Sequence, residues 1–434
     1  MHVILSALGS YGDVLPMVGI GAAARARGHR VQVVANPYFQ DVVAGAGLEL
    51  LPLGTADEYR ELMQHPDLWH PRRGLKLVLG RGAGAYLRQA FATIDANYRP
   101  GETVLAAHGL DLGSRLLHEL RGAPLATVHF APFALVSLHD TPRYIGVPDM
   151  KRWPRWLKYA LYRLGDVAMV DPVIGPPLNA LRRELGLPAV RRIYSVWNNS
   201  PQLVLGLWPD WFAPLQPDWP ECTALTGFPL WDPPAEHAAG ADVNAFLAAG
   251  EPPIAFAPGS ANVQAQEFFR VAVETCQRMG RRGMLLTKYP AQAPDRLPPT
   301  VRQFGFIPFS MLLPRVAALV HHGGIGTCAQ GLAAGIPQVV VPMAYDQLDN
   351  GLRLQRLGVG AVVSRRRLAP RRLARELNRL LTSPSVPRAC AELAQRCDGP
   401  ASLEAACDLL EQLHANRRRP AESCLPQPSH ASKY

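Results

Sequence analysis

The sequence predicts an α/β protein with two Rossmann-like domains, whose parallel sheets face a common cleft. Two observations support this fold class. Short apolar segments typical of β-strands alternate with helical patterns, and this alternation occurs in two separate series along the 434 residues. A stretch rich in proline and tryptophan, 208–234, lies between the two series and has few regular signals. In open parallel sheets, ligands bind beyond the carboxyl ends of the strands, so the site is expected at those ends.

The first series begins at the N-terminus. Its predicted strands are His2–Ala7, Val31–Ala35, Leu48–Leu51, Val104–Ala107 and Leu125–His129. Its predicted helices are Pro16–Arg27, with a proline at its start and Gly28 just past its end, and Pro37–Ala46. Residues 57–100 and 133–200 fit the alternation less well, and we expect them to build the substrate side.

The second series predicts a domain of similar size. Its predicted strands are Ile254–Ala257, Met284–Thr287, Val316–Val320, Gln338–Val341 and Gly360–Val363. We place an acceptor-binding domain at 1–215, a linker at 216–238 and a nucleotide-sugar-binding domain at 239–415. The last helix of the second domain is expected to pack back on the first domain, and residues 416–434 are expected to be a disordered tail.

Composition narrows the class of protein. The chain carries a net charge of +10, but no signature of a nucleic-acid-binding motif accompanies it, so we expect no nucleic-acid partner. No apolar run approaches the roughly 18 residues of a spanning helix, and the N-terminus lacks the pattern of a signal peptide. Seven scattered cysteines without a CxxC spacing suggest neither disulfides nor a metal site. These features favour a cytoplasmic protein.

A glycine-rich segment follows one strand of the second series and opens a helix. It reads His321-His322-Gly323-Gly324-Ile325-Gly326-Thr327. Backbone N–H groups at such a helix N-terminus can bind a diphosphate, the helix dipole adds positive potential, and a histidine can donate a further hydrogen bond. The alternative is a tight turn in which Thr327 caps the helix.

Two polar residues follow the next strand of the same series. Asp346 and Gln347 stand at the start of a predicted helix, where strand ends meet the crevice. Together they can bind neighbouring hydroxyls of a sugar. Alternatively, Asp346 only caps that helix.

The segment from His321 to Asn350 resembles the donor-binding signature of the family 1 glycosyltransferases, which have the GT-B fold. The resemblance implies that His322 and Thr327 contact the diphosphate, and that Asp346 and Gln347 hold the donor sugar. It implies further donor contacts at Ser260 and at Phe306-Ile307, where Phe306 would pack on the nucleobase or else belong to the core. Many members that use UDP-sugars carry a glutamate where this chain has Gln330, and its loss fits a dTDP-sugar.

The loop after the first strand, Gly9–Pro16, resembles the GSxGDVxP loop of bacterial members of this family. In a direct-displacement mechanism the acceptor hydroxyl loses a proton as it attacks the anomeric carbon, and a carboxylate in the cleft can accept it. Asp13 is therefore the predicted catalytic base, and the alternative is that it caps the helix from Pro16. No Asp-x-Asp metal motif is present, so we expect no metal or other cofactor.

The acceptor side is less defined. Lys151–Arg163 has five basic residues and no acidic one, with tryptophans at helical spacing. Such a helix suits a membrane interface, although its tryptophans could instead pack in the core or the acceptor pocket. The opening segment and the proline-rich stretch are similar to the rhamnosyltransferases of rhamnolipid biosynthesis. Similarity to that subgroup leaves open which of His321 and His322 contacts the diphosphate.

The leading hypothesis is an inverting transfer of L-rhamnose from dTDP-L-rhamnose to a 3-(3-hydroxyalkanoyloxy)alkanoate, with possible peripheral contact at the inner face of the cytoplasmic membrane. Alternatives within the class are UDP-glucose as donor to a hydroxy-lipid and a dTDP-deoxysugar transferred to a polyketide. A nucleotide-sugar epimerase of the same fold and a catalytically silent partner subunit are weaker alternatives, because Asp13, His322 and Asp346 are all present.

Overall fold

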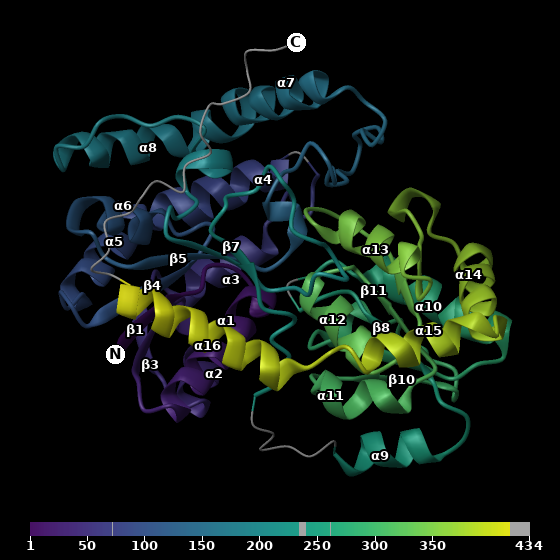
Figure 1. Cartoon of the computed structure of the whole chain (residues 1–434). Coiled ribbons are helices and arrows are strands. Elements are labelled where there is room, and N and C mark those ends of the chain that lie inside the picture. The colour runs from purple at the N-terminus through teal and green to yellow at the C-terminus, as the bar shows by residue number, and fades with distance from the viewer. Residues whose placement is uncertain (72, 234–239, 261, 417–434) are drawn as a thin grey trace.

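The computed structural model describes residues 1–434 except 72, 234–239, 261 and 417–434. Two parallel sheets, each flanked by helices, form two Rossmann-like domains and confirm the predicted fold class (Figure 1). The expected tail lies outside the described residues from 417 onward, as does the end of the expected linker. Within the described part of the chain, no helix combines the length and apolar content needed to cross a membrane.

The first sheet has seven parallel strands in the order β3-β2-β1-β4-β5-β6-β7. They are β1 (His2–Ser6), β2 (Arg30–Ala35), β3 (Glu49–Pro52), β4 (Thr103–His108), β5 (Leu125–His129), β6 (Leu203–Gly206) and β7 (Thr223–Leu225). Strand β1 is buried at every position, as expected for a central strand covered on both faces. Its neighbours β2 and β4 pair with it in parallel along its whole length.

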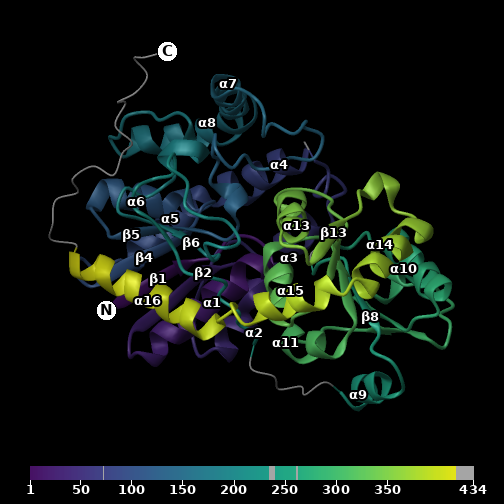
Figure 2. The ribbon, with the colours of Figure 1, turned by 45° about the vertical axis from the view of Figure 1, so that its right-hand side comes forward.

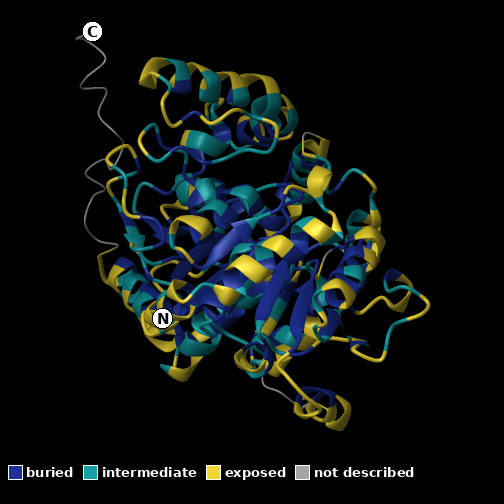
Figure 3. Cartoon of the chain, turned by 90° about the vertical axis from the view of Figure 1, so that its right-hand side faces the viewer, coloured by how far each residue is buried: buried dark blue, intermediate teal, exposed yellow. Residues whose placement is uncertain are grey.

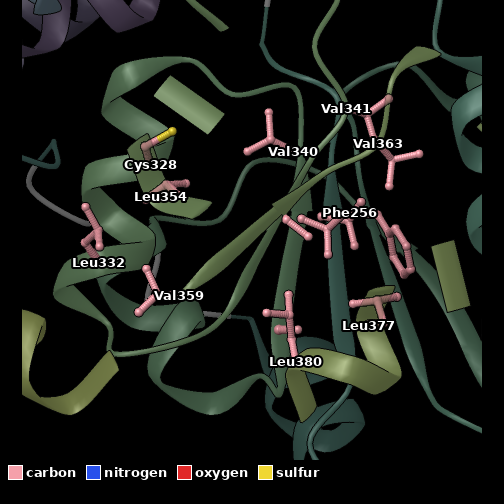
Figure 4. Packing of buried hydrophobic residues seen from close by; sticks show 14 of the residues in the cluster. Phe256, Cys328, Leu332, Val340, Val341, Leu354, Val359, Val363, Leu377 and Leu380 are labelled. Carbon is pink, nitrogen blue, oxygen red and sulfur yellow. The ribbon is translucent and has the colours of Figure 1, made fainter. Parts of the chain in front are cut away.

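The second sheet has six parallel strands in the order β10-β9-β8-β11-β12-β13. They are β8 (Ile254–Ala257), β9 (Gly283–Leu286), β10 (Val301–Phe304), β11 (Ala318–His321), β12 (Gln338–Val340) and β13 (Gly360–Val362). Figure 4 shows the core on one face of this sheet, where Phe256, Val340 and Val363 pack toward Leu377 and Leu380.

Helices surround both sheets. In the first domain they are α1 (Tyr11–Ala26), α2 (Gln40–Gly45), α3 (Ala56–Gln64), α4 (Arg73–Leu77), α5 (Ala85–Asn97), α6 (Leu112–Arg121), α7 (Arg155–Gly165) and α8 (Asp171–Glu184). In the second part of the chain they are α9 (Ala241–Ala248), α10 (Gln266–Met279), α11 (Phe309–Leu312), α12 (Ile325–Ala333), α13 (Gln347–Arg356), α14 (Pro370–Thr382), α15 (Ser385–Ala394) and α16 (Gly399–Ala415). Figure 3 shows that the strands are buried, while exposed residues recur along the outward faces of the helices.

Helix α16 returns to the first domain and lies along α1 (Figures 1 and 2). Its buried residues Ala406, Cys407 and Leu410 belong to the core that surrounds β1 and α1. The end of the chain therefore covers the N-terminal sheet.

Several predicted boundaries were wrong. Helix α1 begins at Tyr11 instead of Pro16, because Ser10 caps it and Pro16 lies inside it. The helix expected over 37–46 is divided into a 3-10 turn, Pro37–Phe39, and α2. Strand β7 falls within the expected linker, since it pairs with β6 and extends the first sheet to Leu225. Strands β6 and β10 were not predicted.

Buried charges join the two domains next to α13. The guanidinium of Arg353, only 3% exposed, lies 2.8 Å from the Asp349 carboxylate and 2.9 Å from that of Asp140 in the first domain. Tyr345 also crosses the boundary, because its hydroxyl donates to the carbonyl of Leu68 over 2.6 Å. These contacts hold α13 against the first domain.

Candidate functional site

A single large cleft of about 1510 Å³ lies between the domains. Its walls include segments that follow β1, β4 and β5 in the first domain and β8, β9, β11 and β12 in the second. These are the carboxyl ends of parallel strands, where ligands bind in open α/β folds.

Asp13 lies at the first-domain wall of this cleft, in the first turn of α1. Its Oδ2 accepts the backbone N–H of Ser10 over 2.7 Å, and the Ser10 hydroxyl accepts the N–H of Gly12 in return over 3.2 Å. This is a capping box, so Asp13 does serve the helix N-terminus. A side chain at Gly9 would lie 2.2 Å from Oδ2, so only glycine fits beside this carboxylate. Oδ1 lies outside this cap.

The surroundings of Asp13 favour its protonated form. Burial raises its pKa to about 6, although the bonds from Ser10 oppose the shift. The other oxygen, Oδ1, faces Nε2 of His108 at 4.0 Å. Burial lowers the pKa of His108 to about 4, so this imidazole is neutral at pH 7 and leaves the carboxylate without a counter-charge. A carboxylate with a raised pKa is a stronger base than an exposed one.

Two histidines in this wall were not predicted as site residues. His108 ends β4 and His129 ends β5, and both line the cleft. His129 is hydrogen-bonded to the Oδ1 of Asn199 through its Nε2 over 2.8 Å, and burial lowers its pKa to about 4. The available signal was their position at the carboxyl ends of apolar strands, directly before a turn.

The glycine-rich turn forms the opposing wall. Helix α12 has Gly324 as its N-cap, without a side-chain cap, so the N–H groups of the first turn have no partner from the helix. Gly326 and Thr327 of that turn line the cleft. Thr327 is not the cap, so the alternative role considered for it was wrong. The arrangement is an anion site of the expected kind.

His322 lies in the cleft wall, and glycines surround its ring. A side chain on Gly324 would lie 2.6 Å from Nε2, and one on Gly259 would lie 3.0 Å from the same atom. Burial lowers the pKa of His322 to about 4, so the ring is neutral and can donate one hydrogen bond.

His321 and Gly323 do not line the cleft, contrary to the expected donor contacts. His321 is fully buried in β11, and its Nδ1 accepts the N–H of Gly323 over 3.2 Å. Gly323 permits close packing, because a Cβ there would lie 2.5 Å from Val340. Successive strand side chains point to opposite faces, which separates His321 from His322. Of the two histidines, His322 is therefore placed to contact a ligand.

Asp346 and Gln347 both lie at the cleft, where α13 begins. Asp346 makes no capping bond, and its Oδ2 instead accepts the amide of Asn350 over 2.6 Å. Gln347 uses its Oε1 to accept the backbone N–H of Met343 over 2.7 Å, which leaves its NH₂ group for a ligand. Tyr345, directly before them, has a positive φ of 55°, a strained conformation for a residue with a side chain.

Asp346 and Asp13 act on each other electrostatically across the cleft. Burial raises the pKa of Asp346 to about 7, and the charge of Asp13 adds to the shift. Tyr194, which lines the cleft, feels both carboxylates, and burial together with their charges raises its pKa to about 12. The structure thus brings a carboxylate from each domain to one site.

Phe306 extends into the cleft with 55% of its surface exposed, so it is not a core residue. Lys288 places its ammonium 5.3 Å from that ring and 4.9 Å from the ring of Tyr11 in the first domain. Ile307 also borders the cleft, but it is 7% exposed and belongs to the core. Ser260 is exposed at the cleft. Lys288 was not predicted.

Gln330 lines the cleft, and its amide donates to Asp232 over 3.3 Å. Asp232 comes from the expected linker and also accepts the backbone N–H of Ser310 over 3.1 Å. A carboxylate therefore lies beside the position where many relatives have glutamate, although it comes from another segment of the chain.

Comparison with known proteins agrees with this geometry. Residues 286–411 match the family of the erythromycin biosynthesis protein CIII-like C-terminal domain. The chain is 30% identical to an O-mycaminosyltylonolide 6-deoxyallosyltransferase of Streptomyces fradiae, over 95% of this chain and 97% of the relative. It is 31% identical to glycosyltransferase GtfE of Amycolatopsis orientalis, over 83% of this chain and 85% of the relative.

Solved structures share the fold. The glycosyltransferase of kitacinnamycin matches with a TM-score of 0.73 at 22% identity, covering 95% of this chain and 98% of the other. A spinosyn rhamnosyltransferase matches with a TM-score of 0.66 at 19% identity, covering 94% and 100%. From the whole-length relatives and the matching family model, the chain belongs to the family 1 glycosyltransferases of the GT-B fold, in the EryCIII-like group.

Proposed function

We propose that this glycosyltransferase moves a 6-deoxysugar from a dTDP-sugar to an acceptor hydroxyl with inversion, and that L-rhamnose is the first sugar to test. One observation carries the proposal. The carboxylate of Asp13 from the first domain and the sugar-binding pair Asp346 and Gln347 from the second line one cleft with the anion site of α12. A base, a sugar site and a diphosphate site are the parts that direct displacement at an anomeric carbon requires.

The residues suggest the following reaction. Asp13 accepts the proton of the acceptor hydroxyl while the hydroxyl oxygen attacks the anomeric carbon from the side opposite the diphosphate. The bond between that carbon and the diphosphate oxygen breaks, so the configuration inverts. The N-terminus of α12 and the neutral ring of His322 donate hydrogen bonds to the departing diphosphate. Lys288 supplies a positive charge at the same cleft. Metal independence stays a prediction.

The donor assignment draws on relatives. The spinosyn rhamnosyltransferase is known in complex with thymidine diphosphate, and glycosyltransferase VinC is known in complex with dTDP. Gln330, in place of the glutamate of many UDP-sugar users, supports the same base and a deoxyribose. UDP-glucose remains the alternative donor.

The acceptor is proposed to be large and mainly apolar. Beyond Asp13 the cleft is lined by side chains such as Leu79, Phe133, Tyr144 and Met169. This lining suits both chains of a 3-(3-hydroxyalkanoyloxy)alkanoate. A polyketide is the second candidate, because the similar transferases act on O-mycaminosyltylonolide and bind a spinosyn aglycone.

A transfer assay read by mass spectrometry tests the proposal. Purified protein is offered dTDP-L-rhamnose or UDP-glucose, each with a hydroxyalkanoyloxyalkanoate or a macrolide aglycone, with and without EDTA. We expect a rhamnosylated product from the dTDP donor alone, unchanged by EDTA. A hexosyl product from UDP-glucose would overturn the donor assignment, and loss of product with EDTA would overturn metal independence. The acceptor that is glycosylated decides between the two acceptor classes.

A further inference from the structure

We propose that the outward face of α7 and the π-helical turn η4 (Asp166–Val170) binds an anionic phospholipid membrane surface. We call this face the α7 surface; it consists of the exposed residues Arg155, Trp156, Tyr159, Arg163, Leu164 and Val167. Docking of this face does not depend on the identity of the donor or the acceptor.

The α7 surface is apolar on the side where a surface helix is normally polar. Trp156 is 70% exposed, Leu164 60%, Val167 59% and Tyr159 44%. These four are among only nine large hydrophobic residues that are exposed in the described part of the chain. Their spacing places them on one side of the helix. Trp156 therefore does not pack in the core, which was the alternative considered from the sequence.

The opposite side of α7 faces the protein. Lys158 is 3% exposed, and its ammonium donates to the carbonyl of Leu138 over 2.9 Å. Leu157 and Leu161 are half-buried on the same side. The helix is thus fixed with a lysine turned inward and a tryptophan turned outward, and rotation cannot hide the apolar face without exposing this buried contact.

Positive charge surrounds the apolar side chains. Lys151, Arg152, Arg155 and Arg163 are exposed, and residues 151–165 include no acidic side chain. Among the described residues, none of these four forms an ion pair, although Arg163 lies over the ring of Tyr159. A second copy of this face would repel it, whereas anionic lipid headgroups complement it and the acyl region accepts tryptophan and leucine.

The position of α7 permits contact with a flat surface. The helix lies at the outer edge of the first domain, away from the second domain (Figures 1 and 2). The cleft reaches this edge, because Leu164 and Ala168 belong to its lining. If the proposed lipid acceptor is correct, it can pass from the bilayer into the cleft at this point; this consequence alone rests on the proposed function.

Binding to vesicles tests the proposal. Full-length protein is sedimented with vesicles of phosphatidylcholine alone or with about 30% phosphatidylglycerol, at low and high salt. We expect binding to the anionic vesicles that weakens with salt, since each basic residue near such a surface contributes favourably. We expect the double variant Arg155→Gln/Arg163→Gln to bind at least about tenfold more weakly, and Trp156→Ala to bind several-fold more weakly. Neither residue lines the cleft, so thymidine diphosphate should bind both variants as it binds the original protein.

Matched controls distinguish this face from general basic charge. Arg365 and Arg366 are exposed in the second domain, so Arg365→Gln/Arg366→Gln removes the same charge elsewhere. Leu215, 54% exposed, gives an apolar control as Leu215→Ala. Lipids brominated on their acyl chains should quench the tryptophan fluorescence of the original protein, and Trp156→Phe should lose much of this quenching. No binding to anionic vesicles, or equal losses in the α7 and control variants, would overturn the proposal.

Discussion

At the residue scale, Asp13 has two roles that constrain each other. One carboxylate oxygen caps α1 through the N–H of Ser10, and this bond fixes the side chain in one orientation. The other oxygen faces the cleft beside the neutral ring of His108. The cap supplies the rigidity that a positioned base requires, so the two roles considered from the sequence are compatible.

The rate of transfer should fall at acidic pH. The pKa of Asp13 is raised to about 6 and that of Asp346 to about 7, so both groups lose their charge as the pH falls through 7 to 5. A protonated Asp13 cannot accept the acceptor proton. We expect kcat/KM to fall at least about tenfold per pH unit below pH 6, measured with saturating donor and limiting acceptor. A rate that is flat between pH 5 and 8 would contradict this account.

Sequence reasoning placed residues well where a long motif defined them. Asp346 and Gln347 belong to a run of about 30 residues, and both reach the cleft. His108 and His129 each follow a single apolar strand, where a histidine satisfied in the core looks the same in sequence. Lys288 was missed because its position depends on the approach of Tyr11 from the other domain.

At the element scale, the turn before α12 is shaped by what its glycines exclude. Gly324 leaves room for the ring of His322, and Gly323 lets the turn pack against Val340. Gly326 differs, because a Cβ there would meet no atom within 4 Å, although the residue lines the cleft. Its space is therefore available to a ligand.

Replacing Gly326 by alanine should weaken nucleotide binding without harming the fold. The added methyl group would occupy cleft space beside the N–H groups of α12, where we place the diphosphate. We expect thymidine diphosphate to bind at least about tenfold more weakly in a calorimetric titration. Gly45→Ala is the matched control, because that helical glycine also has no neighbour within 4 Å and lies outside the cleft. Equal affinity in all three proteins would show that the diphosphate binds elsewhere.

Element boundaries were harder to predict than element types. The rule that proline favours the first helical position led to a start at Pro16, but the capping box of Ser10 and Asp13 begins α1 earlier. Strand β7 has only three residues inside a proline-rich segment, too few for a periodic pattern. Its pairing with β6 is a tertiary contact, which local sequence does not encode.

At the scale of the whole molecule, the site exists only because the two domains meet. Asp140 in the first domain and Arg353 in the second are joined by a buried ion pair, and Tyr345 donates to Leu68 across the same boundary. The sequence predicted each domain from its own alternation of strands and helices. Pairings between residues so distant in the chain leave no local pattern, so the closed arrangement required the structure.

Removing the buried guanidinium should destabilise the protein. Arg353→Met leaves the carboxylates of Asp349 and Asp140 without their cation, one of them 2% exposed. We expect a loss of about 3 kcal/mol in the free energy of unfolding, measured by urea denaturation. Arg388→Met breaks an exposed pair with Glu392 on α15 and should leave stability unchanged within error. Equal effects of the two substitutions would mean that the interdomain ion cluster does not stabilise the closed form.

The account as a whole depends on Asp13 being the base that acts on a donor held by the other domain. The most direct measurement compares Asp13→Asn with the original protein for transfer and for thymidine diphosphate affinity in the same preparation. Asparagine keeps the size of the side chain and an oxygen that can cap α1, but it cannot accept the proton. We predict a loss of transfer of about 10²–10⁴-fold, with unchanged nucleotide affinity. Transfer at the original rate by Asp13→Asn would contradict the account and leave Asp13 as a helix cap.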